Sequence, residues 1–126
     1  MSKKRIAIVE DSPYNRLLFQ AMLEDRFDVV EFEDGETALA GRRGAAPDLV
    51  LMDISLPRMD GTEVLSKLRE DETLRSVPVI ALTAHAMRGD REKYLGLGFD
   101  DYVTKPVVDE ASLFEPIDRL LATAAG

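Results

Sequence analysis

The segment DLVLMDISLPRMDG, residues 48–61, leads a run of apolar side chains directly into a carboxylate. Four apolar residues precede Asp53, and the chain then turns through Pro57 and an aspartate-glycine pair. Short apolar runs that do not alternate with polar residues are typical of parallel strands covered by helices on both faces. We therefore predict a buried strand that brings Asp53 to one edge of a sheet, followed by a turn that leaves its carboxylate accessible.

Four other segments have the composition of strands, and helical patterns separate them. The predicted strands cover residues 5–10, 27–33, 48–53, 77–83 and 101–104. Among the helical patterns, one closes at Gly44 and another runs from Ala86 to Leu97. This alternation predicts a three-layer α/β domain, a flavodoxin-like doubly wound parallel sheet of the (βα)5 type. The weaker strands at 27–33 and 101–104 belong at the edges, which gives the strand order 2-1-3-4-5.

Composition narrows the classes of function. The 126 residues carry a net charge of −8 and no cysteine. The negative charge disfavours binding to nucleic acid or anionic lipid, and a chain without cysteine has no disulfide or thiolate chemistry. No segment has the length of a membrane span or of a signal sequence. We expect a cytoplasmic protein without membrane insertion, and a monomer, with a dimer as the alternative.

Polar side chains follow the predicted strands at the points where the strands end. These residues are Glu10 and Asp11 after the first strand, Asp53 on the third, Thr83 on the fourth and Lys105 after the fifth. Because the carboxyl ends of parallel strands lie at the same edge of a sheet, we expect these side chains to lie close together. Clustered carboxylates repel one another and need a cation or protons, so this edge is a candidate cation site.

The chemistry of this set favours a hard metal ion and phosphoryl transfer. Oxygen ligands without cysteine or histidine suit Mg²⁺, with Mn²⁺ or Ca²⁺ as alternatives. We expect Asp11 and Asp53 to bind the ion directly and Glu10 to bind it through water. A carboxylate can also attack phosphorus to form an aspartyl phosphate. In that reaction the metal, Lys105 and the Thr83 hydroxyl would each hold one equatorial oxygen.

Taken together, the segments IVEDS, LVLMDISLPRMDG, VIALTAH and DDYVTKP resemble the receiver domain of two-component response regulators. The similarity runs from about Lys4 to Leu121 and leaves no length for an output domain. The resemblance therefore implies a single receiver domain over residues 1–126, of the stand-alone CheY-like or DivK-like kind. The motif TAHAMRGD is closest to DivK-like proteins, but it also occurs in receivers fused to hybrid kinases.

The resemblance implies a role for each acidic residue at the predicted edge. Glu10 and Asp11 match the acidic pair that binds Mg²⁺. Asp53 matches the phosphoacceptor, and the backbone carbonyl of Ser55 matches the third protein ligand of the metal. Lys105 matches the lysine that contacts the phosphoryl group.

The resemblance also implies a signalling mechanism. Thr83 matches the switch hydroxyl, and Tyr102 matches an aromatic ring that changes rotamer on activation. The phosphoryl donor in this family is a phosphohistidine on a sensor histidine kinase or a phosphotransfer protein, and a downstream protein recognises the changed surface. Such a protein is a phosphoacceptor that assists its own phosphorylation, and we do not expect an ordinary enzyme. The alternative is an interaction module on the receiver fold that works without phosphorylation.

Two enzyme-like or cofactor-binding alternatives are weaker. A flavodoxin-like FMN protein needs a loop that cradles phosphate after the first strand, but the segment EDSPYN has two carboxylates and no glycine. An aspartyl-phosphate phosphatase typically has a second acid two residues after the nucleophile, where this chain has Ser55. Ser55 and His85 occupy the positions that tune hydrolysis in the family. Neither is a carboxylate or an amide, so we predict a phosphoryl bond that lasts minutes or longer.

Several residues have structural alternatives. Asp11 or Ser12 can cap the helix after the first strand. Pro116 falls inside the last helical pattern, where proline removes a hydrogen bond, so we predict a kink or a late start at Ser112. A kink or a late start would alter the surface that the family uses for output. We interpret His85 as a loop residue near the mouth of the site and not as a catalytic group.

Overall fold

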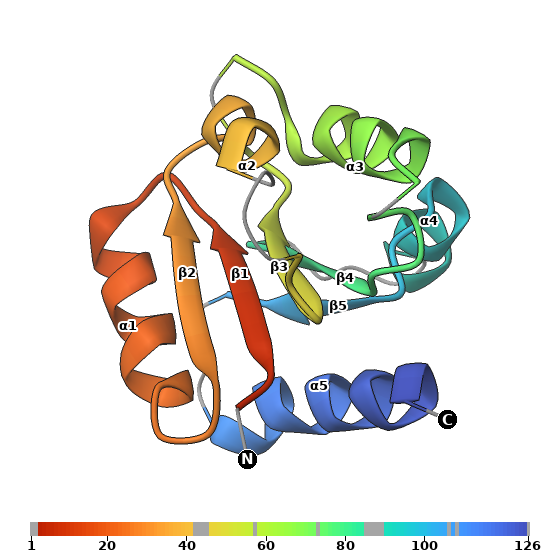
Figure 1. Ribbon diagram of the computed structural model, residues 1–126. Helices are drawn as coiled ribbons and strands as arrows, with labels where there is room; N and C mark the ends of the chain where they lie inside the picture. The colour runs from red at the N-terminus through yellow and green to blue at the C-terminus, as the bar shows by residue number, and fades with distance from the viewer. Residues whose placement is uncertain are drawn as a thin grey trace.

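The computed structural model describes residues 3–41, 46–56, 58–72, 74–84, 90–105, 107 and 109–125. Within them, five strands alternate with five helices (Figure 1). The strands are β1 (Arg5–Val9), β2 (Asp28–Phe32), β3 (Leu49–Asp53), β4 (Val79–Thr83) and β5 (Asp101–Thr104). The helices are α1 (Pro13–Leu23), α2 (Gly35–Gly41), α3 (Gly61–Glu70), α4 (Asp90–Leu97) and α5 (Glu110–Ala125). All five predicted strands are confirmed.

The strands form one parallel sheet in the order β2-β1-β3-β4-β5. Strand β1 pairs with β2 on one side and with β3 on the other, and β4 lies between β3 and β5. Every residue of β3 and β4 is buried, whereas β2 at the edge is partly exposed. The predicted doubly wound α/β topology is confirmed, because the continuous apolar runs form the central strands and the mixed runs form the edges.

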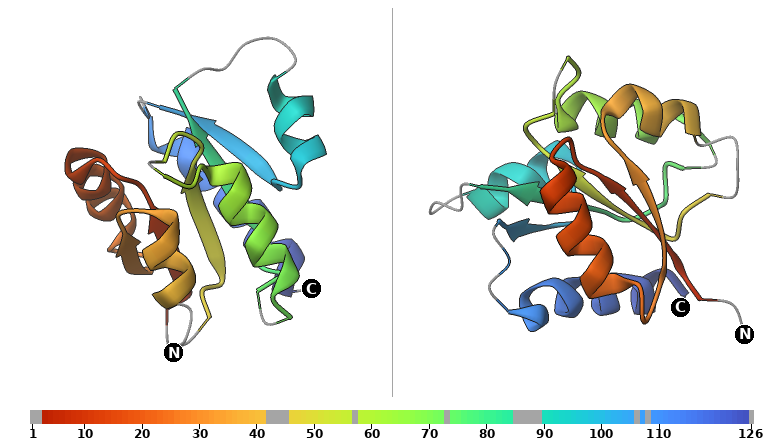
Figure 2. Two further views of the ribbon diagram at one scale, coloured as in Figure 1. Left: turned by 90° about the horizontal axis from the view of Figure 1, so that it is seen from above. Right: turned by 90° about the vertical axis from the view of Figure 1, so that its left-hand side faces the viewer.

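Two apolar clusters, one on each face of the sheet, hold the three layers together. One cluster packs Leu68 of α3 and Tyr94 of α4 against the sheet, with α2 at its margin. The other packs Leu23 of α1 and Ile117 of α5 against the opposite face. Figures 1 and 2 show the sheet between these two groups of helices. The loops that carry the predicted polar residues thus follow the strand ends, at the edge of the sheet between the two layers of helices.

The turn after β3 is held close to the strand. The N–H of Gly61 donates to the carbonyl oxygen of Ile54 at 3.0 Å. A Cβ atom at Gly61 would lie 2.4 Å from the carbonyl oxygen of Asp53, so only glycine fits without a backbone shift. Asp60 caps α3 by accepting the N–H of Glu63 at 3.0 Å. The aspartate-glycine pair therefore fixes the start of α3 directly behind the end of β3.

Helix α5 begins earlier than the sequence predicted. Asp109 Oδ1 accepts the N–H of Ser112 at 2.9 Å and its hydroxyl at 3.1 Å, so Asp109 caps the helix. The helix continues through Pro116. Leu113 and Ile117, on either side of the proline, are fully buried against the sheet. The predicted start at Ser112 is wrong, because Asp109 caps the helix three residues earlier. The packing of Leu113 and Ile117 supports the helix through Pro116, although proline removes one backbone hydrogen bond. The predicted kink stays a prediction.

Two predicted helix limits lie outside the described residues, namely the end at Gly44 and the start at Ala86. The described part of α4 ends at Leu97, before Gly98 with a φ of 110°, in agreement with the predicted end. None of the helices in the described part of the chain has the length and apolarity that a membrane span requires.

Candidate functional site

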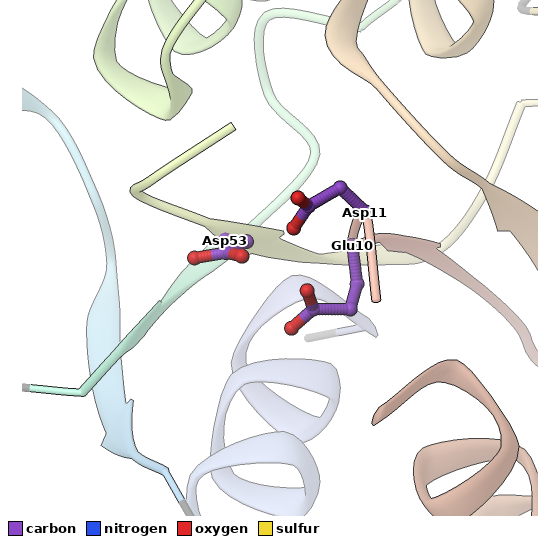
Figure 3. Close-up of side chains that lie close together, drawn as sticks. All are labelled: Glu10, Asp11 and Asp53. Atoms are coloured by element: carbon purple, nitrogen blue, oxygen red, sulfur yellow. The ribbon is translucent and has the colours of Figure 1, made fainter. Parts of the chain in front are cut away.

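Three carboxylates meet where β1 and β3 end. Glu10 and Asp11 directly follow β1, and Asp53 is the last residue of β3, the neighbouring strand. One carboxylate oxygen from each residue lies within 4.8 Å of the others, and Figure 3 shows the three side chains together. Glu10 and Asp53 are only 1% and 3% exposed, whereas Asp11 is exposed to solvent. The structure thus brings these residues together at one edge, as the strand ends predicted.

Backbone N–H groups hold the two buried carboxylates in place. Glu10 Oε2 accepts the N–H of Ser12 at 3.1 Å, and Asp53 Oδ1 accepts the N–H of Ser55 at 3.0 Å. The Ser12 side chain also caps α1 by accepting a backbone N–H of its first turn at 3.2 Å. Ser12 is therefore the cap, and the carboxylate of Asp11 is not used for that purpose.

Lys105, directly after β5, joins the two buried acids. Its Nζ lies 2.8 Å from Glu10 Oε1 and 3.2 Å from Asp53 Oδ2. The backbone N–H of Lys105 donates to the carbonyl oxygen of Thr83 at 2.7 Å, which ties the loop after β5 to the end of β4. The ammonium of Lys105, positioned by β4 and β5, thus contacts carboxylates at the ends of β1 and β3. Its positive charge offsets one of the three negative charges of the cluster.

The electrostatics of this cluster show an excess of negative charge. Burial raises the pKa of the Glu10 carboxyl, and the nearby Asp53 adds to this effect, while Lys105 and the N–H of Ser12 oppose it without cancelling it. Burial would lower the pKa of Lys105, but its contacts with Glu10 and Asp53 outweigh burial, so the pKa is raised. The three carboxylates carry more negative charge than their partners neutralise, and they offer only oxygen ligands. Both features fit Mg²⁺.

The sequence of this chain matches the family model of the response regulator receiver domain over residues 6–118. The chain belongs to the response regulator receiver family. Receiver domains act in two-component signalling, where phosphorelay and aspartate phosphorylation are inherent to the family, and they bind Mg²⁺ at an acidic pocket. They are signalling proteins and not ordinary enzymes. The acidic cluster described above lies within the matched region.

Relatives and solved structures agree with this assignment. The chain is 43% identical over 105 residues, 82% of this chain and 85% of the other, to the polar-differentiation response regulator DivK of Brucella ovis. It is 37% identical, with a TM-score of 0.85 and coverage of 96% and 99%, to the receiver domain of sensor histidine kinase PA1611 from Pseudomonas aeruginosa PAO1, which has a magnesium ion coordinated in its active-site cleft. The chemotaxis protein CheY4 of Vibrio cholerae shares the fold, with a TM-score of 0.86, 23% identity and coverage of 94% and 99%.

The two residues predicted to act as a switch, Thr83 and Tyr102, lie on the α4 side of the sheet. Thr83 ends β4 and is buried, and its hydroxyl lies 3.2 Å from the hydroxyl of Tyr94 on α4. Tyr102, on β5, is half-buried and packs against the apolar cluster that contains Tyr94. The rings of Tyr94 and Tyr102 have their centres 6.0 Å apart. Sequence reasoning missed Tyr94, although an aromatic residue in the otherwise polar start of α4 was a signal.

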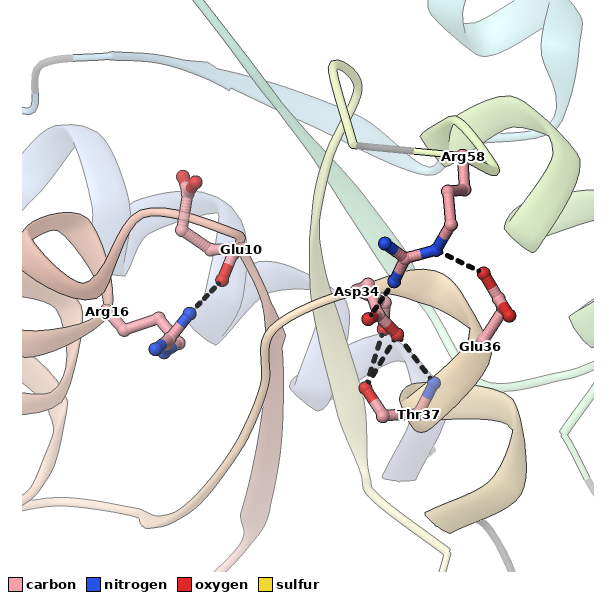
Figure 4. Close-up of polar contacts among 6 residues, drawn as sticks. All are labelled: Glu10, Arg16, Asp34, Glu36, Thr37 and Arg58. Atoms are coloured by element: carbon pink, nitrogen blue, oxygen red, sulfur yellow. Dashed lines mark hydrogen bonds and ion pairs between the residues drawn. The ribbon is translucent and has the colours of Figure 1, made fainter.

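A second polar cluster of the receiver lies beside the site. Asp34, between β2 and α2, accepts the N–H of Thr37 at 2.8 Å and its hydroxyl at 2.9 Å. Arg58, in the turn after β3 with a φ of 61°, reaches Asp34 Oδ2 at 2.5 Å and Glu36 Oε1 at 2.8 Å (Figure 4). These contacts tie the turn that follows Asp53 to the start of α2. Sequence reasoning missed this cluster, because Arg58 comes from a different loop than its partners.

Arg16 is a further residue that the sequence did not reveal. Its Nη1 donates to the backbone carbonyl oxygen of Glu10 at 2.7 Å (Figure 4). Its Nε lies 3.5 Å from Glu31 Oε1. Arg16 thereby fixes the backbone at the end of β1, from which both acids of the pair project. The position of a basic residue in α1 soon after two acids was the available signal.

Two predicted features of the receiver site are not placed by the structure. His85 lies outside the described residues, so its interpretation as a loop residue stays a prediction. The N–H of Ser55 is seen on Asp53, but the role of its carbonyl oxygen as a metal ligand also stays a prediction.

Proposed function

We propose that this receiver domain accepts a phosphoryl group on Asp53 from a phosphohistidine, with Mg²⁺ bound beside the carboxylate. The observation that carries the proposal is the position of Asp53 between an ammonium group and two other acids. Lys105 Nζ lies 3.2 Å from Asp53 Oδ2, and oxygens of Glu10 and Asp11 lie within 4.8 Å of an Asp53 oxygen. A nucleophilic carboxylate, a cation for a phosphoryl oxygen and ligands for a metal are therefore present at one point.

The residues of the cluster divide the work of holding the ion. Both oxygens of Glu10 already accept contacts, from the N–H of Ser12 and from Lys105, which favours a role through water. Asp11 is exposed and Asp53 is the neighbouring acid, so we expect these two to bind the ion directly, together with the carbonyl of Ser55. Bound Mg²⁺ supplies positive charge that lets a phosphoryl group approach three acids, and Mn²⁺ is the alternative ion.

In the transfer, an Asp53 carboxylate oxygen forms a bond to phosphorus while the phosphorus–nitrogen bond of the phosphohistidine breaks. The imidazole nitrogen keeps the electron pair of that bond, so a protonated phosphohistidine leaves as neutral imidazole. Lys105 holds one phosphoryl oxygen through a charge-assisted hydrogen bond. The N–H of Ser55, which is already on Asp53 Oδ1, keeps the carboxylate oriented for attack.

The signal follows from the new charge. A phosphoryl group adds about −1.5 to −2 charge and three strong acceptor oxygens. The hydroxyl of Thr83 moves toward one of these oxygens, Tyr102 turns inward, and the surface around α4 and β5 changes. A downstream protein recognises the changed surface, and the donor is a sensor histidine kinase or a phosphotransfer protein. We place the protein in the cytoplasm, where receiver regulators typically act.

Labelling with acetyl phosphate and Mg²⁺, followed by intact and peptide mass spectrometry, tests the proposal. We expect one phosphoryl group on the parent chain, located on Asp53, with a lifetime of minutes or longer. Asp53→Asn should take up no label, whereas the matched control Asp25→Asn, an exposed aspartate in the turn after α1, should label like the parent.

Equal labelling of Asp53→Asn and the parent would show that Asp53 is not the acceptor. A parent chain that takes up no phosphoryl label, and that does not bind beryllofluoride as a substitute for the phosphoryl group, would instead favour the interaction module that works without phosphorylation. Loss of the label within seconds would contradict the predicted lifetime.

A further inference from the structure

The hydroxyl groups of Thr83 and Tyr94 form a buried pair between the sheet and α4. Their oxygens are 3.2 Å apart, and the two residues are 3% and 6% exposed. Every buried side-chain nitrogen or oxygen in the described part of the chain has a hydrogen-bond partner. A buried hydroxyl that loses its partner costs more free energy than a hydrogen bond usually contributes. The pair therefore resists any movement that separates Thr83 from Tyr94.

Tyr94 is also fixed by its ring. The ring meets Phe99 edge-on at a centroid distance of 6.3 Å and meets Tyr102 at 6.0 Å. Lys93 Nζ lies over the Tyr94 ring at 5.7 Å from its centre. Because three neighbours hold the ring, the hydroxyl cannot follow Thr83 without disturbing α4 and β5. The residue that holds Thr83 is thus in contact with the ring whose rotation carries the signal.

We propose that the Tyr94 hydroxyl is a positioning group that holds Thr83 in the resting state and competes with a phosphoryl oxygen for the threonine hydroxyl. This inference rests on the proposed function at Asp53. Phosphorylation moves Thr83 away from Tyr94, and the cost of the separated pair opposes the active state. The strength of this contact therefore sets how much of the receiver is active at a given level of phosphorylation.

Tyr94→Phe tests the inference because it removes the hydroxyl and keeps the ring that packs on Phe99 and Tyr102. Beryllofluoride titrations in excess Mg²⁺, followed by amide NMR, would compare the parent, Tyr94→Phe, Thr83→Ala and the double variant. We expect Tyr94→Phe to bind beryllofluoride roughly threefold to tenfold more tightly than the parent, the factor that corresponds to one neutral hydrogen bond. Tyr14→Phe, at an exposed tyrosine of α1, is the matched control and should not change the affinity.

The double variant separates a role through Thr83 from a general effect on packing. In the Thr83→Ala background, Tyr94→Phe should leave the affinity unchanged, because the hydroxyl that it releases is already absent. Equal or weaker binding by Tyr94→Phe than by the parent would overturn the inference. The same gain in both backgrounds would overturn it as well. A parent chain that does not bind beryllofluoride at all would refute the proposed function itself.

The parent chain offers a second test that needs no substitution. The ¹³Cζ chemical shift of Tyr94 reports the hydrogen bond of its hydroxyl. We expect this shift to change on saturation with beryllofluoride as Thr83 leaves. An unchanged Tyr94 signal, with amide shifts at Thr83 that show binding, would contradict the inference even if Tyr94→Phe failed to fold.

Discussion

Two acidic clusters lie at the same edge of the sheet, and their carboxylates behave in opposite ways. In the Asp34 cluster, hydrogen bonds from the N–H and the hydroxyl of Thr37, together with the charge of Arg58, hold the pKa of Asp34 below its usual value. In the cluster of Glu10, burial holds the pKa of the glutamate above its usual value despite Lys105. The carboxylate of Asp34 is fully paired by residues of its own cluster, whereas the Glu10 cluster has negative charge that its own residues do not neutralise.

We interpret this difference as one between charge that stabilises the fold and charge that is available to bind a cation. The buried carboxylate of Asp34 is complete without any ligand, so its contacts serve the fold by joining the turn after β3 to α2 (Figure 4). Glu10 and Asp53 share one ammonium and face a third acid, Asp11 (Figure 3). Repulsion among these acids destabilises the fold unless a cation is bound. We expect a substitution in the Asp34 cluster to lower stability without changing metal binding, and removal of Asp11 to weaken metal binding without lowering stability.

The largest expected effect is the loss of metal binding in Asp11→Ala. This variant should weaken Mg²⁺ binding by about tenfold or more, since the loss of even indirect support for a metal ligand typically costs 10–100-fold. Its free energy of unfolding without Mg²⁺ should stay equal or rise, because one source of repulsion is gone. Mg²⁺ titration by calorimetry and urea denaturation would measure the two quantities.

Asp34→Ala is the reverse case and serves as the control. It should lower the free energy of unfolding, because it removes the contacts to Thr37 and Arg58, and it should leave the affinity for Mg²⁺ unchanged. Asp11→Ala with the Mg²⁺ affinity of the parent would remove Asp11 from the metal site. Loss of Mg²⁺ binding in Asp34→Ala would show that the two clusters act as one.

Gly61→Ala probes the support behind Asp53 and should have an effect of intermediate size. Its new methyl group would meet the carbonyl oxygen of Asp53, so the end of β3 or the start of α3 must shift. We expect a loss of about 1–3 kcal/mol in the free energy of unfolding, as is typical of overpacking. Phosphorylation of Asp53 should also become slower. Chemical denaturation and the rate of labelling by acetyl phosphate would measure both.

Gly96→Ala is the matched control for Gly61→Ala. A Cβ atom at Gly96, on α4, meets nothing within 4 Å. Because alanine favours a helix over glycine by up to about 1 kcal/mol, this variant should be as stable as the parent or more stable. If both glycine variants lost the same stability, the close approach behind Asp53 would not explain the effect.

The smallest expected effect is on the pH dependence of stability. Because the pKa of Asp34 is lower in the folded than in the unfolded chain, its contribution is complete above the unfolded value of about 4 and is lost as the pH falls through the folded value. Asp34→Asn should therefore make the loss of stability on acidification less steep. Urea denaturation at a series of pH values from about 7 to 3, without Mg²⁺, would test this. Parallel curves for the parent and Asp34→Asn would contradict the assigned contacts.

The sequence was sufficient for features that depend on local pattern. The apolar runs predicted the strands and their order, and the residues at the strand ends predicted which side chains meet, including Asp53 and Lys105. Features that depend on contacts between distant side chains were missed. Examples are the hydroxyl pair of Thr83 and Tyr94 and the tie from Arg58 to Asp34.

The start of α5 shows the same limit. A proline in a helical pattern predicted a kink or a late start, but Asp109 caps the helix earlier, and residues on both sides of Pro116 are buried against the sheet. The roles of the site residues and the oligomeric state stay predictions, because they concern chemistry and partners.

Amide NMR of the parent chain during a Mg²⁺ titration tests the central claim most directly. If the cluster with excess charge is the metal site, the amide signals of Glu10, Asp11 and Asp53 should move together and saturate, while those of Asp34 and Thr37 stay in place. The same titration of Asp11→Ala should give much smaller movements at equal concentrations of Mg²⁺. Movements spread evenly over both clusters, or none at the ends of β1 and β3, would contradict the account.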